Sequence, residues 1–220
     1  MNRFSFSLLL NDRKTVITAH SGCENTAANS REHILAAIES GCEMVEVDVR
    51  MADGLLYLSH DLPVDYRNCV TLRECFSMIK PQENLGINID AKTEGLPDAV
   101  LALASEFDLK RRIIFTGSCN YDRARIAAQG SEMWRSMWDG DRIADGIQAN
   151  MRDGSPLLNV HYPMITDEYD RTLRAAGGRF SAGTVDDPAE IRRFLEAGIG
   201  NITTRKPHLA MTLRREIQGI

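Results

Sequence analysis

Residues 46–61 read EVDVRMADGLLYLSHD, a stretch that combines two carboxylates, a tight-turn signal and a histidine. Glu46 and Asp48 stand two apart in a run of β-branched residues, so both carboxylates leave the same face of a predicted strand. The Asp-Gly dipeptide that follows is a hairpin signal between two apolar-alternating arms. If the two arms pair, the second arm carries His60 back to the level of the carboxylates.

The register of this hairpin decides on which face His60 lies. A two-residue loop pairs Ala52 with Leu55 and turns the imidazole to the wrong face. A three-residue loop with a left-handed glycine pairs Met51 with Leu55 instead. That register brings His60 beside Glu46, and we predict it because only it assembles a site. The alternative is a surface hairpin with a polar face.

The composition is that of an ordinary globular chain of 220 residues, with 43% hydrophobic and 26% charged residues. The net charge of -5 argues against general binding to nucleic acid, although a phosphate site can still be locally basic. The five cysteines show neither CxxC nor zinc spacing, which favours a reducing compartment over a disulfide framework. The apolar patch near the N-terminus is too short for a signal peptide or a membrane span. We therefore expect one cytoplasmic domain over 1–220 with a small-molecule partner, no nucleic-acid or membrane partner, and an oligomeric state that the sequence leaves open.

Predicted strands alternate with predicted helices along nearly the whole chain. This alternation implies a parallel sheet covered by helices. Eight repeats in 220 residues favour a closed barrel over an open sheet, because such barrels run from roughly 200 residues upward. We predict an α/β fold, a (β/α)8 TIM barrel, with the β-hairpin as an extension after the second strand. Strands are expected at 15–20, in the first arm of the hairpin, and at 85–92, 112–116, 131–138, 157–162, 180–185 and 200–204; helices are expected at 30–41, 71–79, 98–107, 120–129, 141–151, 166–176, 188–197 and 207–217.

Polar residues recur in four of these strands, at or near the ends where a barrel of this kind carries its catalytic groups. A satisfied buried polar group explains one such residue but not a recurrence in four strands, so we interpret them as parts of one site. They are His20 on the first strand, Glu46 and Asp48 on the second, Asp90 and Lys92 on the third, and Thr204-Arg205 on the last.

The residue types in this set suit phosphodiester chemistry. Glu46, Asp48 and Asp90 offer three carboxylate oxygens, which fit Mg²⁺ or Ca²⁺ and do not fit zinc. Two histidines flank the acids, so one can take a proton from a nucleophile while the other gives one to a leaving group. Lys92 follows Asp90 by two residues, faces the same way, and can meet an anion held on the metal.

Three more side chains are candidates for the walls of the pocket. Trp134 and Trp138, four apart near the end of the fifth strand, could stack on a sugar ring, with core or rim packing as the alternative. His161 ends the sixth strand and could line the pocket, with a structural histidine as the alternative.

Several short segments occur in the order and at the spacings of one known family. Each motif alone is weak, but together they span residues 15–217 and make the combined signal strong. HSGCENT (20–26) is similar to an HRG…ENT motif of that family, and EVDV (46–49), the DG turn and HD (60–61) together are similar to its second block. INIDAK (87–92) is similar to an IExK strand. Near the end of the chain, GTVDD (183–187) is similar to WTVN and GIGNITTRKP (198–207) to GVDGIITDRP. On these motifs the chain resembles the glycerophosphodiester phosphodiesterase family.

The resemblance implies a (β/α)8 barrel that uses a divalent metal to hydrolyse a phosphodiester to an alcohol and a phosphomonoester. In such a mechanism a hydroxyl next to the phosphate attacks first, and water opens the resulting cyclic phosphate. The roles implied are His20 and His60 as the acid–base pair, Glu46, Asp48 and Asp90 as metal ligands, and Lys92 as a contact to the phosphate.

Two departures from the family pattern concern phosphate binding. Ser21 stands where the family has an arginine, which removes a cation, and Arg205 stands where the family has an aspartate. The first and last strands are neighbours in a closed barrel, so the two changes meet in space. We hypothesise that Arg205 replaces the lost arginine, the alternative being a surface arginine on a loop.

Other departures concern the size of the pocket. Asp90 is one methylene shorter than the family's glutamate, which should draw the metal toward the third strand. Gly183 replaces a tryptophan, and the segment that follows the second histidine, 62–70, is short. An emptier mouth indicates an alcohol bulkier than glycerol, such as a sugar, and agrocinopine-type sugar phosphodiesters are one class that would fit.

Two other functions stay open at the level of sequence. The first is a phospholipase D-like lyase that stops at the cyclic phosphate. The second is a catalytically impaired barrel that binds a phosphate ligand, for which the missing arginine is the best support. The presence of both histidines, three carboxylates and Lys92 opposes the second, because a binder does not need an acid–base pair.

Overall fold

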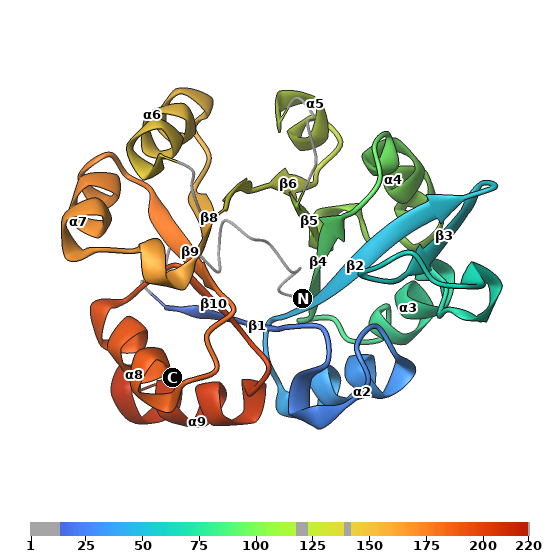
Figure 1. Cartoon of the computed structure of the whole chain (residues 1–220), viewed down its shortest axis with the longest axis horizontal. Coiled ribbons are helices and arrows are strands. Elements are labelled where there is room, and N and C mark those ends of the chain that lie inside the picture. Colours follow the sequence, from blue (N-terminus) through green and yellow to red (C-terminus); the bar gives the residue numbers. More distant parts are fainter. Residues whose placement is uncertain (1–13, 118–122, 139–141, 220) are drawn as a thin grey trace.

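The chain is described by a computed structural model over residues 14–117, 123–138 and 142–219. Parallel strands surround a common centre and helices cover the outside of the ring (Figure 1). The strands are β1 Val16–Ala19, β2 Met44–Ala52, β3 Leu55–Leu58, β4 Gly86–Ala91, β5 Ile113–Gly117, β6 Glu132–Met133, β7 Arg135–Met137, β8 Leu157–His161, β9 Arg179–Gly183 and β10 Asn201–Thr204. The helices are α2 Arg31–Ser40, α3 Leu72–Ile79, α4 Leu96–Phe107, α5 Arg123–Ala127, α6 Ile143–Asp153, α7 Asp167–Ala175, α8 Pro188–Ala197 and α9 Pro207–Gln218.

The strand order is that of a nearly closed (β/α)8 barrel. It runs β6-β5-β4-β2-β1-β10-β9-β8-β7, and β3 pairs with β2 outside this path. The segments β6 and β7 are two parts of one strand interrupted at Trp134, and they pair with β5 and β8 respectively. The predicted fold class and the hairpin extension are confirmed. Parts of two predicted helices, residues 120–122 and 141, lie outside the described residues.

Helix boundaries follow from local capping. The side-chain oxygens of Ser30, Thr71 and Asp187 accept hydrogen bonds from backbone N–H groups in the first turns of α2, α3 and α8. Gly41 and Gly198 take left-handed conformations just after α2 and α8, and so end these helices. These caps place each helix, and hence the strand before it, at a defined height around the barrel.

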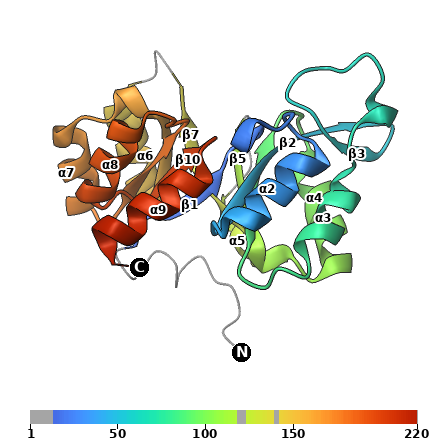
Figure 2. The same ribbon diagram turned by 90° about the horizontal axis from the view of Figure 1, so that it is seen from below.

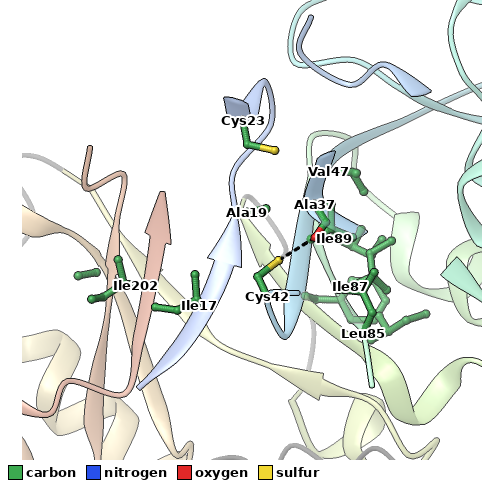
Figure 3. Close-up of a cluster of buried hydrophobic side chains, with 14 of the residues drawn as sticks. Ile17, Ala19, Cys23, Ala37, Cys42, Val47, Leu85, Ile87, Ile89 and Ile202 are labelled. Carbon is green, nitrogen blue, oxygen red and sulfur yellow. Dashed lines mark hydrogen bonds between the residues drawn. The ribbon is translucent and has the colours of Figure 1, made fainter. Parts of the chain in front are cut away.

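The core has two parts because successive strand residues face opposite ways. One large cluster lies between the strands and the helices; Figure 3 shows a portion of it, including Ile17, Val47 and Ile202. A second cluster lies on the alternate, inward-facing positions at the start of the strands and consists of Val16, Met44, Ile114, Trp134 and Leu157. This inner cluster seals one end of the barrel, so the opposite end is left for a site.

The register predicted for the β2–β3 hairpin is wrong. Ala52 pairs with Leu55, and Met51 with Leu56, so the loop has two residues rather than three. Asp53 and Gly54 both adopt positive φ, 49° and 77°, which is the backbone of a tight two-residue turn. Aspartate tolerates the left-handed region, so no third loop residue is needed. Figure 2 shows β3 and the following loop standing off to one side of the barrel.

No helix within the described ranges, 14–117, 123–138 and 142–219, is long and apolar enough to cross a membrane.

Candidate active site

Three acidic side chains from two adjacent strands converge at the open end of the barrel. The β2–β4 register pairs Asp48 with Asp90, and Glu46 precedes Asp48 by two residues on the same face. One oxygen from each of the three carboxylates lies within 4.8 Å of the others. Glu46 and Asp48 are buried, with 4% and 3% of their surface exposed. The convergence expected from the sequence is therefore present.

The segment after β1 fixes two of these acids. The backbone N–H of Ser21 donates to Oε2 of Glu46 at 2.8 Å. The Asn29 side chain makes a pair of bonds with Asp48: its Nδ2 donates to Oδ2 at 2.8 Å, and its Oδ1 accepts from the backbone N–H at 3.0 Å. Asn29 itself has a φ of 57°, a left-handed conformation that asparagine tolerates. Both acids are thus held in place by neutral hydrogen-bond donors from one loop segment.

Lys92 is the cation nearest to the acids. Its Nζ lies 2.9 Å from Oδ2 of Asp90 and 3.1 Å from Oδ1 of Asp48. Burial opposes the charge on Lys92, but the carboxylates of Asp90 and Asp48 outweigh it and raise the pKa of the ammonium. Burial raises the pKa of Glu46 well above its usual value, and the neighbouring Asp48 and Asp90 raise it further. Three carboxyl groups thus share one lysine, and their mutual repulsion adds to the burial that raises the pKa of Glu46.

The Asp90 carboxyl group has one oxygen without a hydrogen-bond partner among the described residues. Burial raises the pKa of this carboxyl, whereas Lys92 opposes the rise. Its Oδ1 is buried and accepts no hydrogen bond within the described residues. Gly117, which ends β5 with a φ of +83°, lies directly beside it, and a Cβ built at Gly117 would stand 1.9 Å from that oxygen. The missing side chain at Gly117 therefore makes room for the Asp90 carboxylate.

These features fit a hard divalent cation. The donors are all carboxyl oxygens, and one of them, Oδ1 of Asp90, has no hydrogen-bond partner among the described residues. Mg²⁺ and Ca²⁺ are bound in proteins by this type of donor set.

His20 lies at the end of β1 and lines the same pocket as Glu46 and Asp90. Its Nδ1 is 2.9 Å from the carbonyl oxygen of Ser21. Burial lowers the pKa of His20, with the Ser21 carbonyl opposing that change. The imidazole is thus held in a fixed orientation and favours its neutral form.

His60 lies outside the pocket. Its side chain is 65% exposed, and Nδ1 is 2.9 Å from Oδ1 of Asp61. The carbonyl of His60 accepts hydrogen bonds from the Arg50 guanidinium. The preceding residue, Ser59, donates its N–H to the carbonyl of Asp48 at 3.0 Å, so the backbone of His60 still runs beside the acidic strand. The two-residue loop sets His60 level with Val47, whose side chain leaves the face opposite to Glu46.

A pocket of about 600 Å³ opens over the acidic cluster. Of the wall residues expected from the sequence, Trp138, His161 and Arg205 line it. Trp134 does not, because it is buried in the inner cluster with 1% of its surface exposed. The lining residues are His20, Glu46, Asn88, Asp90, Thr116, Met137, Trp138, Asn159, Val160, His161, Gly183, Thr184, Thr203 and Arg205.

Arg205 is held at the pocket by Asp186. The β1–β10 pairing makes the first and last strands neighbours, and the backbone N–H of Glu24, four residues after His20, donates to the Arg205 carbonyl at 2.8 Å. The Arg205 backbone N–H and Nη1 both donate to the Asp186 carboxylate, at 2.7 and 2.8 Å. Burial would raise the pKa of Asp186, but the Arg205 contacts hold it below its usual value. The guanidinium is therefore anchored beside the segment that follows His20.

Sequence reasoning missed several lining residues that the strand period could have found. Asn88 precedes Asp90 by two residues, Asn159 precedes His161 by two, and Thr203 precedes Arg205 by two. Side chains two apart on a strand share a face, so each belongs to the same inward surface. Asn29 carried no such signal, because it reaches Asp48 from a loop.

The comparisons with known proteins agree on one family, although no family model matches the chain. The chain is 21% identical over 241 residues to a glycerophosphodiester phosphodiesterase from Caldanaerobacter subterraneus, covering 92% of this chain and 99% of that protein. A glycerophosphodiester phosphodiesterase from Parabacteroides distasonis has a similar structure, with a TM-score of 0.73 and 19% identity over 94% of this chain and 98% of that chain. A phosphodiesterase from Oleispira antarctica, solved with the product sn-glycerol 3-phosphate, also has a similar structure. Its TM-score is 0.74 and its sequence identity 19%, and the match covers 95% of this chain and 98% of that chain.

Fold and site together define a (β/α)8 barrel with a cluster of three carboxyl groups in a pocket at the carboxyl ends of its strands. The similarity to these proteins extends over nearly the full length of both partners. This similarity supports membership of the chain in the glycerophosphodiester phosphodiesterase family, a family of phosphoric diester hydrolases.

Proposed function

We propose that this chain is a divalent-metal-dependent phosphodiesterase that hydrolyses a sugar or similarly hydroxylated phosphodiester to an alcohol and a phosphomonoester. The observation that carries the proposal is the convergence of Glu46, Asp48 and Asp90 within 4.8 Å, in contact with Lys92. Family membership supports the reaction class.

Glu46, Asp48 and Asp90 would hold Mg²⁺ or Ca²⁺, and such a cation supplies charge stabilisation to phosphoryl oxygens. The Ser21 N–H and the Asn29 amide keep two of the acids in place. Lys92 adds a positive charge at the same point, where negative charge develops on the phosphoryl group.

His20 acts as the general base. Its Nδ1–H donates to the Ser21 carbonyl, so the neutral ring carries its lone pair on Nε2. Because burial lowers its pKa, the ring is neutral near pH 7 and can accept a proton from the attacking hydroxyl.

His60 acts as the general acid. Asp61 lies 2.9 Å from its Nδ1 and can accept a hydrogen bond from the protonated ring. The ring lies outside the pocket on the face opposite to Glu46, so the role of His60 rests on the family resemblance and needs a rearrangement of the segment after β3. The backbone contact between Ser59 and Asp48 keeps this segment beside the acidic strand.

Arg205 binds the phosphate in place of the arginine missing at Ser21. Its anchoring by Asp186 and its place in the pocket lining support this role over that of a surface arginine. Arginine suits a phosphate because its guanidinium offers two parallel donors.

The pocket supports an alcohol larger than glycerol. Gly183 lines it where relatives of this motif carry tryptophan, and Trp138 and His161 offer ring faces at its wall. Trp138 is 52% exposed, as expected for a side chain that packs on a ligand.

The experiment is a turnover assay with a sugar phosphodiester and sn-glycero-3-phosphocholine, in Mg²⁺ or Ca²⁺, with and without EDTA. We expect release of a phosphomonoester that EDTA abolishes, with kcat/KM higher for the sugar diester. His20→Ala and His60→Ala should each lower kcat at least about a hundredfold, the usual size of general acid–base catalysis. His208→Ala is the control, because His208 is an exposed histidine on α9 that pairs with Glu24. Full activity of His60→Ala would remove His60 from the mechanism.

Water labelled with ¹⁸O separates hydrolysis from the lyase reaction. Label in the phosphomonoester supports the proposal, whereas an unlabelled cyclic phosphate as the end product supports a lyase. Binding of the diesters without turnover in either metal would indicate a phosphate-binding barrel instead.

A further inference from the structure

The inward face of the barrel carries a polar layer directly above its apolar end. Barrels of this class ordinarily fill such positions with branched aliphatic side chains. Here the inner apolar cluster is followed, two residues further along most strands, by hydroxyl and amide side chains. We call this set the polar layer: Thr18, Asn88, Thr116, Ser136, Asn159, Ser181, Asn201 and Thr203.

Hydrogen bonds link the polar layer from strand to strand. From β1, the Thr18 hydroxyl donates to Oδ1 of Asn201 at 2.7 Å, and Asn201 Nδ2 donates to Oγ of Ser181 at 2.9 Å. Ser181 in turn donates to Oδ1 of Asn159 at 2.9 Å, and Asn159 Nδ2 donates to Oγ of Ser136 at 3.2 Å. Each amide is thereby fixed in one orientation, because its oxygen and its nitrogen have different partners.

This chain of bonds leaves donors that face the pocket. Asn201 Nδ2 also donates to Oγ1 of Thr203 at 3.1 Å, so the hydroxyl hydrogen of Thr203 remains for another acceptor. Asn88 uses Oδ1 to accept from Thr116 at 2.8 Å, and its Nδ2 makes no hydrogen bond within residues 14–117, 123–138 and 142–219. Asn159 keeps a second amide hydrogen. All three residues line the pocket.

We propose that Asn88, Asn159 and Thr203 form a floor that binds hydroxyl groups of the organic part of the substrate. This inference rests on the proposed function, because it assigns the part of the pocket that the phosphate does not occupy. The charged groups, Lys92 and Arg205, suit the phosphate, whereas the floor is neutral and suits uncharged hydroxyls. A polar donor left unpaired in a buried site costs about 1–3 kcal/mol, so a hydroxylated ligand is favoured over an apolar one.

The floor therefore determines specificity by the presence of hydroxyls rather than by size alone. Sites built to bond a substrate hydroxyl discriminate strongly against the analogue that lacks it. Gly183, which lacks a side chain, leaves space for the organic part of the ligand, and the floor favours ligands that carry hydroxyl groups in that space.

The test compares phosphomonoesters that differ only in hydroxyl groups, by calorimetry in Mg²⁺ buffer. The pairs are sn-glycerol 3-phosphate with propyl phosphate, and myo-inositol 1-phosphate, whose polyhydroxylated six-membered ring stands in for a sugar ring, with cyclohexyl phosphate. We expect the wild-type protein to prefer the hydroxylated member at least about tenfold in Kd, and Asn88→Leu and Asn159→Leu to reduce this ratio below about threefold. The pair with the larger ratio shows whether the floor suits a three-carbon chain or a sugar ring.

Asn84→Leu is the matched control. It makes the same substitution at an exposed asparagine in the loop before β4, which does not line the pocket, so it should keep the wild-type ratio. Melting temperatures of all variants show whether each protein is folded.

Three outcomes overturn the proposal: equal affinity of the wild-type protein for both members of a pair, an equal loss for both members in Asn88→Leu and Asn159→Leu, or a collapse of the ratio in Asn84→Leu as well. Failure of every phosphomonoester to bind also overturns it. In that case the turnover assay decides separately whether the phosphodiesterase function falls.

Discussion

At the scale of single residues, the space beside Asp90 depends on Gly117. We expect Gly117→Ala to displace the Asp90 carboxylate, because the new Cβ would stand 1.9 Å from its Oδ1. Affinity for Mg²⁺ or Ca²⁺, measured by calorimetry, should fall at least about tenfold through the loss of one charged ligand. Gly154→Ala is the control: Gly154 also has positive φ, +63°, but nothing lies within 4 Å of its Cβ position. Both variants carry the backbone cost of roughly 1–2 kcal/mol, and only the first should lose metal.

Arg205 gives a second prediction at this scale. Arg205→Ala should weaken the binding of a phosphomonoester about tenfold and raise KM, because a charge-assisted contact is lost. Arg193→Ala is the matched control, since Arg193 is a surface arginine that pairs with Glu190 on α8. Calorimetry and steady-state kinetics measure the two effects. Unchanged KM and kcat in Arg205→Ala would assign the phosphate to other groups.

At the scale of elements, the sequence predicted the strands and helices well and the hairpin register badly. Strand and helix patterns depend on apolar periodicity and caps, which are local, so β2 and α3 could be located from their own residues. The hairpin register depends on whether Asp53 accepts a left-handed backbone, with φ of 49° here. A pattern of residue types does not determine this backbone conformation. The three-residue loop, predicted because only it assembles a site, is therefore wrong. Asn29 was missed for a similar reason, because a loop residue has no period.

Helix α2 carries a buried histidine with a pH-dependent effect on stability. His33 is fully buried, and neither ring nitrogen makes a hydrogen bond of normal geometry within the described part of the chain, although the backbone of Ala19 lies close enough to oppose the fall in its pKa. Burial, with a smaller effect of His20, lowers the pKa of His33 from 6.5 to about 4. Between these two values the unfolded chain binds a proton that the folded chain does not, so stability falls as pH falls through this window.

The loss amounts to about 3 kcal/mol by pH 4 and then levels off. Urea unfolding at pH 7, 5.5 and 4.5 measures it. His33→Leu should remove this part of the pH dependence, whereas His208→Leu, at an exposed histidine, should keep it. Identical pH profiles for the wild-type protein and His33→Leu would contradict the prediction.

At the scale of the whole molecule, a buried ion pair joins the two ends of the chain where the barrel closes. The two terminal nitrogens of Arg214 on α9, Nη1 and Nη2, each donate to the Glu43 carboxylate at 2.8 Å. Nη1 also donates to the Thr15 carbonyl at 2.9 Å. Glu43 also accepts from the Ile17 N–H at 3.1 Å. The last helix is thus tied to the segments that begin the first and second strands. The alternation of predicted strands and helices indicated a closed barrel. It did not indicate this ion pair, because Glu43 and Arg214 lie 171 residues apart.

Removing Arg214 leaves the buried Glu43 carboxylate with Lys14, at 3.0 Å, as its ion-pair partner in the described chain, so Arg214→Met should lower the free energy of unfolding by up to about 3–5 kcal/mol. Arg214 is 2% exposed, whereas Arg215 is an exposed neighbour on the same helix, so Arg215→Met is the control and should change stability by less than about 0.5 kcal/mol. The double variant Glu43→Met/Arg214→Met should be more stable than Arg214→Met alone, since it also removes the buried carboxylate that has lost its two bonds to the guanidinium. Urea unfolding measures all three. If the double variant instead loses as much free energy of unfolding as the two single variants together, that result would show that the two side chains stabilise the barrel by packing and not by their ion pair.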